Sequence, residues 1–131
     1  MTLADRPEPN DAPAQVQRVT FPATINGRIS QAGDVDRFAF SAKRNERFNF
    51  RLRATELHSA LAGRLRVEDT NGVTLVQQES GDGSDPKLGW NAPSDGTFVV
   101  AVSDMYGSGG DAFFYRLEHV APPPHFTATI P

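Results

Sequence analysis

Strict alternation of apolar and polar residues is the feature that most constrains the fold of this chain. In residues 47–54, RFNFRLRA, phenylalanine, leucine and alanine occupy every second position and arginine and asparagine the others. Successive side chains of a β-strand point to opposite faces, so this pattern predicts a half-buried strand. The pattern recurs in residues 35–42, 64–68, 97–102 and 113–120, with shorter candidates at 16–21, 23–29, 73–78 and 87–92.

Turn residues separate these segments. Asn71-Gly72 lies between two apolar runs and predicts a hairpin, because both residues tolerate positive φ. Asp95-Gly96 leads into another strand, and only residues 56–61 could form a turn of helix. Eight or nine short strands predict an all-β, jelly-roll-like antiparallel sandwich. Its predicted core is Phe38, Phe40, Phe48, Phe50, Leu65, Val67, Phe98, Val100, Tyr115 and Leu117.

Composition excludes several classes of function. The 131 residues suit one domain, and the lack of cysteine excludes disulfides, thiolate metal sites and a cysteine nucleophile. A net charge of −3 gives no basic field for nucleic acid, and the arginines between residues 44 and 66 alternate with apolar residues like the wet face of a sheet. No apolar run approaches the roughly 20 residues of a membrane helix, so we expect no membrane insertion.

The two ends of the chain read as linkers. Residues 1–14 contain three prolines and no signal-peptide pattern, and residues 122–131 open with a proline run. After that run, residues 126–130, FTATI, resemble a strand that has no following partner. We therefore expect a fragment of a longer protein: a linker at 1–14, a sandwich at 15–121, and at 122–131 a proline-rich linker with the start of a following domain.

A series of short motifs carries a family resemblance. In order they are EPND at 8–11, GRI at 27–29, GDVDRF at 33–38, NG at 71–72, PSDGTF at 93–98 and YRL at 115–117. The series resembles the bacterial pre-peptidase C-terminal domain, a family that includes the collagen-binding domains of clostridial collagenases. The resemblance covers residues 8–120 and implies a β-sandwich exported from the cytoplasm. It also implies an accessory or binding role, with any catalytic machinery in another domain.

The same resemblance implies a calcium site. In the collagen-binding relatives an acidic N-terminal linker and acidic residues near one strand hold calcium, which prefers six to eight oxygen ligands. Carried over position by position, the ligands here are Glu8, Asn10, Asp11, Asp34 and Asp36. This chain has Arg6 where those relatives have a further acidic residue. The alternative is that Asn10 and Asp11 cap turns while Asp34 and Asp36 end a loop, with Arg6 neutralising the carboxylates.

No catalytic motif emerges from the sequence. The histidines, His58, His119 and His125, have no zinc-ligand spacing, and the chain has no nucleophile elbow. Paired carboxylates such as Asp34 and Asp36 could serve a glycosidase, but no sugar cleft is identifiable. We therefore expect that the chain is not an enzyme.

Aromatic residues supply the candidates for ligand binding. Tyr106 lies in a glycine-rich loop, and Phe114 points away from the face of Phe113 and Tyr115. Tyr106 and Phe114 are therefore the predicted contact residues, unless Phe114 packs beneath that loop. Trp90 alternates with Leu88 and Ala92, which favours a place in the core.

These features predict a noncatalytic accessory or binding module of a secreted or cell-surface multidomain bacterial protein. The alternative is a collagen- or polysaccharide-binding domain attached to a secreted hydrolase. Calcium is the expected cofactor. The expected partners are the other domains of the parent protein and an extracellular protein or polysaccharide, with no nucleic acid.

Overall fold

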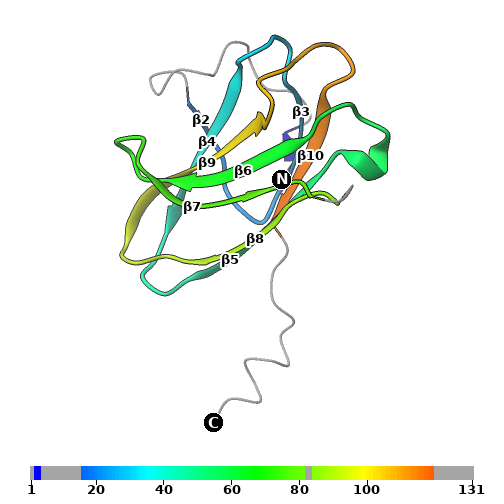
Figure 1. Ribbon diagram of the computed structural model, residues 1–131. Helices are drawn as coiled ribbons and strands as arrows, with labels where there is room; N and C mark the ends of the chain where they lie inside the picture. Colours follow the sequence, from blue (N-terminus) through cyan, green and yellow to red (C-terminus); the bar gives the residue numbers. More distant parts are fainter. Residues whose placement is uncertain (1, 4–15, 82–83, 120–131) are drawn as a thin grey trace.

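Two β-sheets packed face to face form the molecule (Figure 1). The computed structural model describes residues 2–3, 16–81 and 84–119. Sheet I has the strand order β1 (Thr2–Leu3), β3 (Thr24–Arg28), β10 (Phe114–His119), β5 (Arg47–Arg53) and β8 (Lys87–Asn91). Sheet II has the order β2 (Gln17–Arg18), β4 (Val35–Ala42), β9 (Gly96–Asp104), β6 (Gly63–Glu68) and β7 (Thr74–Glu79).

The predicted all-β sandwich is confirmed. The eight strands of five residues or more correspond to the expected segments, and β1 and β2 are two-residue additions that pair in parallel with β3 and β4. All other pairings between the named strands of the described residues are antiparallel. Where a turn of helix was expected, the short 3₁₀ helix η2 (Thr55–Leu57) forms. The predicted boundaries at residues 14–15 and 121–122, with the tail beyond, lie outside the described residues.

The core lies between the sheets and consists of the apolar sides of the alternating strands. All ten residues predicted for it are at most 6% exposed. Phenylalanine rings dominate one end, where the ring centroid of Phe40 lies 4.9 Å from Phe48 and 5.5 Å from Phe50. Trp90 lies 4.9 Å from Phe98 and is 9% exposed, so its predicted place in the core is confirmed.

The hairpin between β6 and β7 forms at the predicted Asn71-Gly72 turn. Gly72 has a φ of 85°, and Asp69 Oδ1 accepts hydrogen bonds from the backbone N–H groups of Asn71 and Val73. This Asx-type arrangement satisfies the turn backbone with a side chain. The turn is therefore set locally, and a bulge between Val67 and Glu68 shifts the register of the β6–β7 pairing beside it.

Candidate functional site

Asp36 and Tyr115 join the two sheets across the core. Asp36 lies on the inward side of β4 and is fully buried, and the Tyr115 hydroxyl on β10 donates a hydrogen bond to its Oδ2 at 2.5 Å. Gly27 is the cross-strand neighbour of Tyr115, and a Cβ at that position would lie 2.4 Å from the tyrosine oxygen. Gly27 therefore makes the room in which the hydroxyl reaches the carboxylate.

Asp34 lies just before β4 and is partly exposed. Its Oδ2 accepts the backbone N–H of Gln31 at 3.1 Å, which closes the turn that leads into the strand. The structure therefore gives Asp34 the turn-capping contact that the alternative interpretation expected. Its exposure also suits a cation ligand, whereas Asp36 is bonded to Tyr115 inside the core.

The predicted calcium site remains a prediction. Glu8, Asn10 and Asp11 lie outside the described residues. Within residues 16–81 and 84–119, no three His, Cys, Asp or Glu side chains gather closely enough to hold a metal ion. Any calcium bound as expected would therefore take most of its protein ligands from the segment before residue 16.

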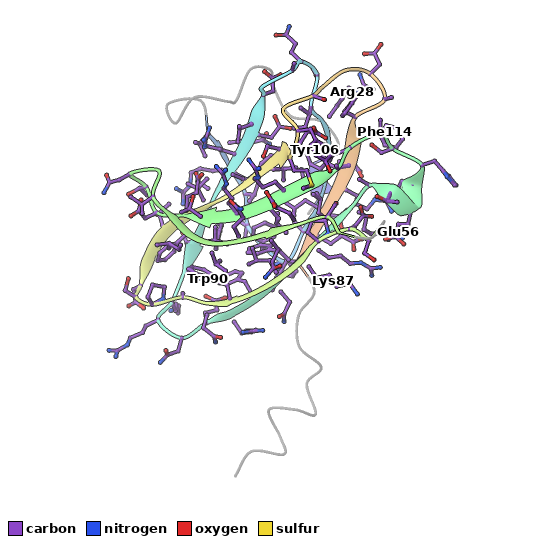
Figure 2. The ribbon with its side chains drawn as sticks, in the orientation of Figure 1. Arg28, Glu56, Lys87, Trp90, Tyr106 and Phe114 are labelled. Atoms are coloured by element: carbon purple, nitrogen blue, oxygen red, sulfur yellow. The ribbon has the colours of Figure 1, made fainter. Side chains whose placement is uncertain are left out.

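Tyr106, a predicted contact residue, is presented by an ordered loop after β9. The buried carboxylate of Asp104 accepts backbone N–H groups from Ala62 at 2.9 Å and from Tyr106 and Ser108 at 3.0 Å each. These bonds fix the loop to the start of β6, and Tyr106 is 77% exposed. Tyr106 is labelled in Figure 2. A large ring held outward on a fixed loop is a suitable contact residue.

Phe114, the second predicted contact residue, lies on the outer face of sheet I. It is half-buried and pairs in register with Arg28 of β3, and the two are labelled near one end of the sandwich in Figure 2. Phe113 turns the other way and packs against the core, as the alternation predicted. Phe114 is thus an apolar ring on an otherwise polar sheet face.

The outer face of sheet I concentrates positive charge. Six of the chain's 13 Lys and Arg residues occupy its outward positions, and we call them the cationic face: Arg28, Arg47, Arg51, Arg53, Lys87 and Arg116. Glu118 on the same sheet and Glu56 on η2 neutralise part of it, chiefly at Arg53, which lies 2.7 Å from Glu56 and 3.5 Å from Glu118. The sequence showed the arginines of residues 47–53, but it could not show that Lys87 and Arg116 lie beside them.

Glu56 owes its position to Asp85. The Asp85 carboxylate accepts the backbone N–H groups of Ala54, Thr55 and Glu56 at 2.8, 2.9 and 3.4 Å, which anchors η2 at the side of the sheet. Burial acts to raise the pKa of Asp85, but these hydrogen bonds outweigh it and lower the pKa below its ordinary value. Asp85 is therefore an ionised structural anchor that leaves Glu56 next to Arg51 and Arg53.

Arg47 is held flat against the sheet. Its Nε donates to Asn49 Oδ1 at 3.1 Å and its Nη1 to Asn91 Oδ1 at 2.8 Å. Beneath it lies Gly89, where a Cβ would come within 2.2 Å of Arg47 Nη2. Glycine weakens the interior of a strand and often marks a close approach by another group. In β8 that group is the Arg47 guanidinium.

His119 ends β10 within the aromatic end of the core. Its Nδ1 accepts the backbone N–H of Asn49 at 3.2 Å, and its ring centroid lies 5.1 Å from Phe48 and 5.8 Å from Phe21. Burial lowers the pKa of His119 below its ordinary value of 6.5, against the opposing effect of Glu46. The histidine therefore packs as a neutral ring.

The architecture is that of the pre-peptidase C-terminal domain, so the resemblance inferred from sequence is confirmed in the fold. The pre-peptidase C-terminal domain of collagenase from Bacillus anthracis has a TM-score of 0.62 over 88% of this chain and 98% of that domain, at 14% identity. PliG of Aeromonas hydrophila, a periplasmic inhibitor of g-type lysozyme, has a TM-score of 0.54. The match covers 80% of this chain and 97% of PliG, at 12% identity. At sequence identities this low, these structural similarities establish the fold alone.

A sequence relative adds a second finding. A probable subtilase-type serine protease of Deinococcus radiodurans is 26% identical over an alignment of 104 residues, and the match covers 73% of this chain and 14% of that protein. The chain thus spans only a small part of the curated relative that it matches. No family model matches the chain. Within the described residues, no helix has the length and apolar character needed to cross a membrane.

Proposed function

We propose that this chain is a noncatalytic accessory module of a larger extracytoplasmic bacterial protein of the protease type. The observation that carries the proposal is its alignment with 14% of a probable subtilase-type protease, which leaves most of that protein to supply the peptidase. The fold of a domain of a bacterial collagenase supports the same role. The other domains of the parent protein are then its first partners.

The second candidate function is binding of an extracellular protein or polysaccharide on behalf of an attached hydrolase. Two surfaces favour it. The exposed Tyr106 is held by the Asp104 loop, and the cationic face covers the outside of sheet I.

Calcium binding belongs to the same proposal. Asp34 contributes a partly exposed carboxylate, and Glu8, Asn10 and Asp11 are the remaining proposed ligands, together with Asp36. A bound ion would rigidify the connection to whatever precedes this module, because its ligands would come from both the linker and the sandwich. Its role would be structural and would supply no step of a reaction.

Sedimentation with insoluble polymers tests the proposed function. The 131-residue chain is incubated with fibrillar collagen, cellulose, chitin and a peptidoglycan preparation, and both pellet and supernatant are analysed. Sedimentation with at least one polymer, without release of soluble fragments, supports a noncatalytic binding module. Release of peptides or sugars by the pure chain, abolished by substitution of a single residue, overturns it.

A further inference from the structure

The cationic face contains more positive charge than the stability of the sheet requires. Arg116 of β10 lies directly opposite Arg53 of β5, and Arg51 lies directly opposite Lys87 of β8. Like charges directly opposite one another on a sheet are destabilising. A net charge of −3 shows that this excess is local to one face.

Part of this charge has no counter-ion among residues 16–81 and 84–119. Within the described residues, Arg47, Arg116 and Lys87 form no ion pair. Arg47 and Arg116 donate instead to neutral amide oxygens, Arg116 to Asn26 at 3.1 Å. An amide partner orients a guanidinium without neutralising it. These arginines are therefore positioned and charged, as an anion-binding group must be.

We propose that the cationic face binds an acidic polysaccharide, a glycan chain bearing carboxylate or sulfate groups. This inference rests on the proposed role as a binding module and names the ligand class. The guanidinium of Arg47, supported by Gly89, presents N–H groups in the planar geometry that matches a carboxylate or sulfate. Binding loses little side-chain entropy there, because the arginine is already held in place.

The residues between the cations select a glycan over other polyanions. Carboxamides of Asn26, Asn49 and Asn91 alternate with the charges. Their oxygens accept hydrogen bonds from Arg116 and Arg47, so these neutral groups space the cations apart, as suits a chain whose acid groups are separated by hydroxyls. Phe114 offers a ring against which the apolar side of a sugar can pack. An acidic peptide would instead bind in an apolar groove or along a free strand edge such as that of β8, through backbone hydrogen bonds and not through this face. Single-stranded nucleic acid relies on aromatic rings that stack its bases, and polyanions of this kind are separate arms of the test.

Native affinity electrophoresis of the 131-residue chain tests the inference. Gels contain polygalacturonate, alginate or chondroitin sulfate, with dextran as the neutral polymer and polyglutamate and single-stranded DNA as the other polyanions. We expect retardation by at least one acidic polysaccharide, none by dextran, and weaker retardation at higher salt. The paired substitution Arg47→Gln with Arg116→Gln is expected to weaken binding about tenfold or more, from the loss of charge-assisted hydrogen bonds.

Two further variants test whether glycan binding depends on where the arginines lie or only on the total charge of the chain. Arg18→Gln with Arg66→Gln removes the same charge from sheet II, where both arginines also donate to neutral side chains, and is expected to leave binding unchanged. Gly89→Ala alters no charge but displaces the flexible end of Arg47, and is expected to weaken binding severalfold. Circular dichroism and urea unfolding verify that each variant is folded.

Three outcomes overturn the inference. They are no retardation by any of the three acidic polysaccharides, equal weakening by the two paired substitutions, and equally tight binding of polyglutamate or DNA. None of these outcomes contradicts the proposed accessory role, since sedimentation with collagen or a neutral polymer would still support a binding module. Conversely, hydrolysis by the pure chain would overturn the proposed function even if glycan binding were found.

Discussion

Removing the hydroxyl group of Tyr115 tests how the two sheets are held together. The substitution Tyr115→Phe keeps the ring in the core and deletes only the donor to the buried carboxylate of Asp36, 2.5 Å away. Removing the donor leaves a buried acceptor without its partner, which costs about 1–3 kcal/mol. For a domain of this size, a fall of about 4 °C in melting temperature per kcal/mol then predicts a total fall of roughly 4–12 °C.

Urea unfolding followed by circular dichroism measures the free energy, and a double-mutant cycle with Asp36→Asn isolates the pairwise part. Tyr106→Phe is the matched control, since it makes the same chemical change at the only other tyrosine, which is 77% exposed. Its effect should stay within about 0.5 kcal/mol. If Tyr115→Phe is as stable as the unchanged protein, or if the cycle shows no coupling, the account of this pair is wrong.

Three further outcomes are expected. Phe50→Ala should cost about 3–5 kcal/mol in urea, because a fully packed ring leaves a cavity, and a cost under about 1 kcal/mol would contradict its burial. Stability should fall as the pH drops below about 6.5, because the His119 pKa is lowered on folding and the unfolded chain binds the proton more readily. His119→Gln should reduce the dependence of the unfolding free energy on pH. An unchanged dependence in this variant would mean that other titrating groups cause it. Millimolar calcium should raise the melting temperature and Asp34→Ala should reduce the rise, whereas no thermal shift would mean that the acidic residues only cap turns.

The core was predictable from sequence because burial in a sandwich follows a local rule. Phe48, Phe50 and Leu52 alternate with polar residues, and the period of two alone assigns them to one face. Trp90 followed from the same reasoning. The hairpin at Asn71-Gly72 was equally local, since turn chemistry depends on adjacent residues.

The surface arrangement was not predictable in the same way. Arg116, Arg53 and Lys87 are far apart in the sequence and meet only through the pairing of β10, β5 and β8. Gly89 gave no sign in the sequence that an arginine would lie across it. For Asp36, the sequence indicated the position but not the partner. Asp36 precedes Phe38 by two residues, so the two side chains share the inward face of the strand, but only the structure showed that Asp36 accepts a hydrogen bond from Tyr115.

The strand order has a consequence for how this module becomes folded in a cell. Each long early strand takes its neighbour from late in the chain, β3 from β10 and β4 from β9. Contacts between such distant segments are slow to form, because the intervening chain must first be ordered. Sheet I lacks its central strand until residues 114–119 are available, so β3 and β5 stay unjoined until then. We therefore expect sheet I to close only after its last strand has been synthesised, whereas every strand of sheet II precedes residue 114.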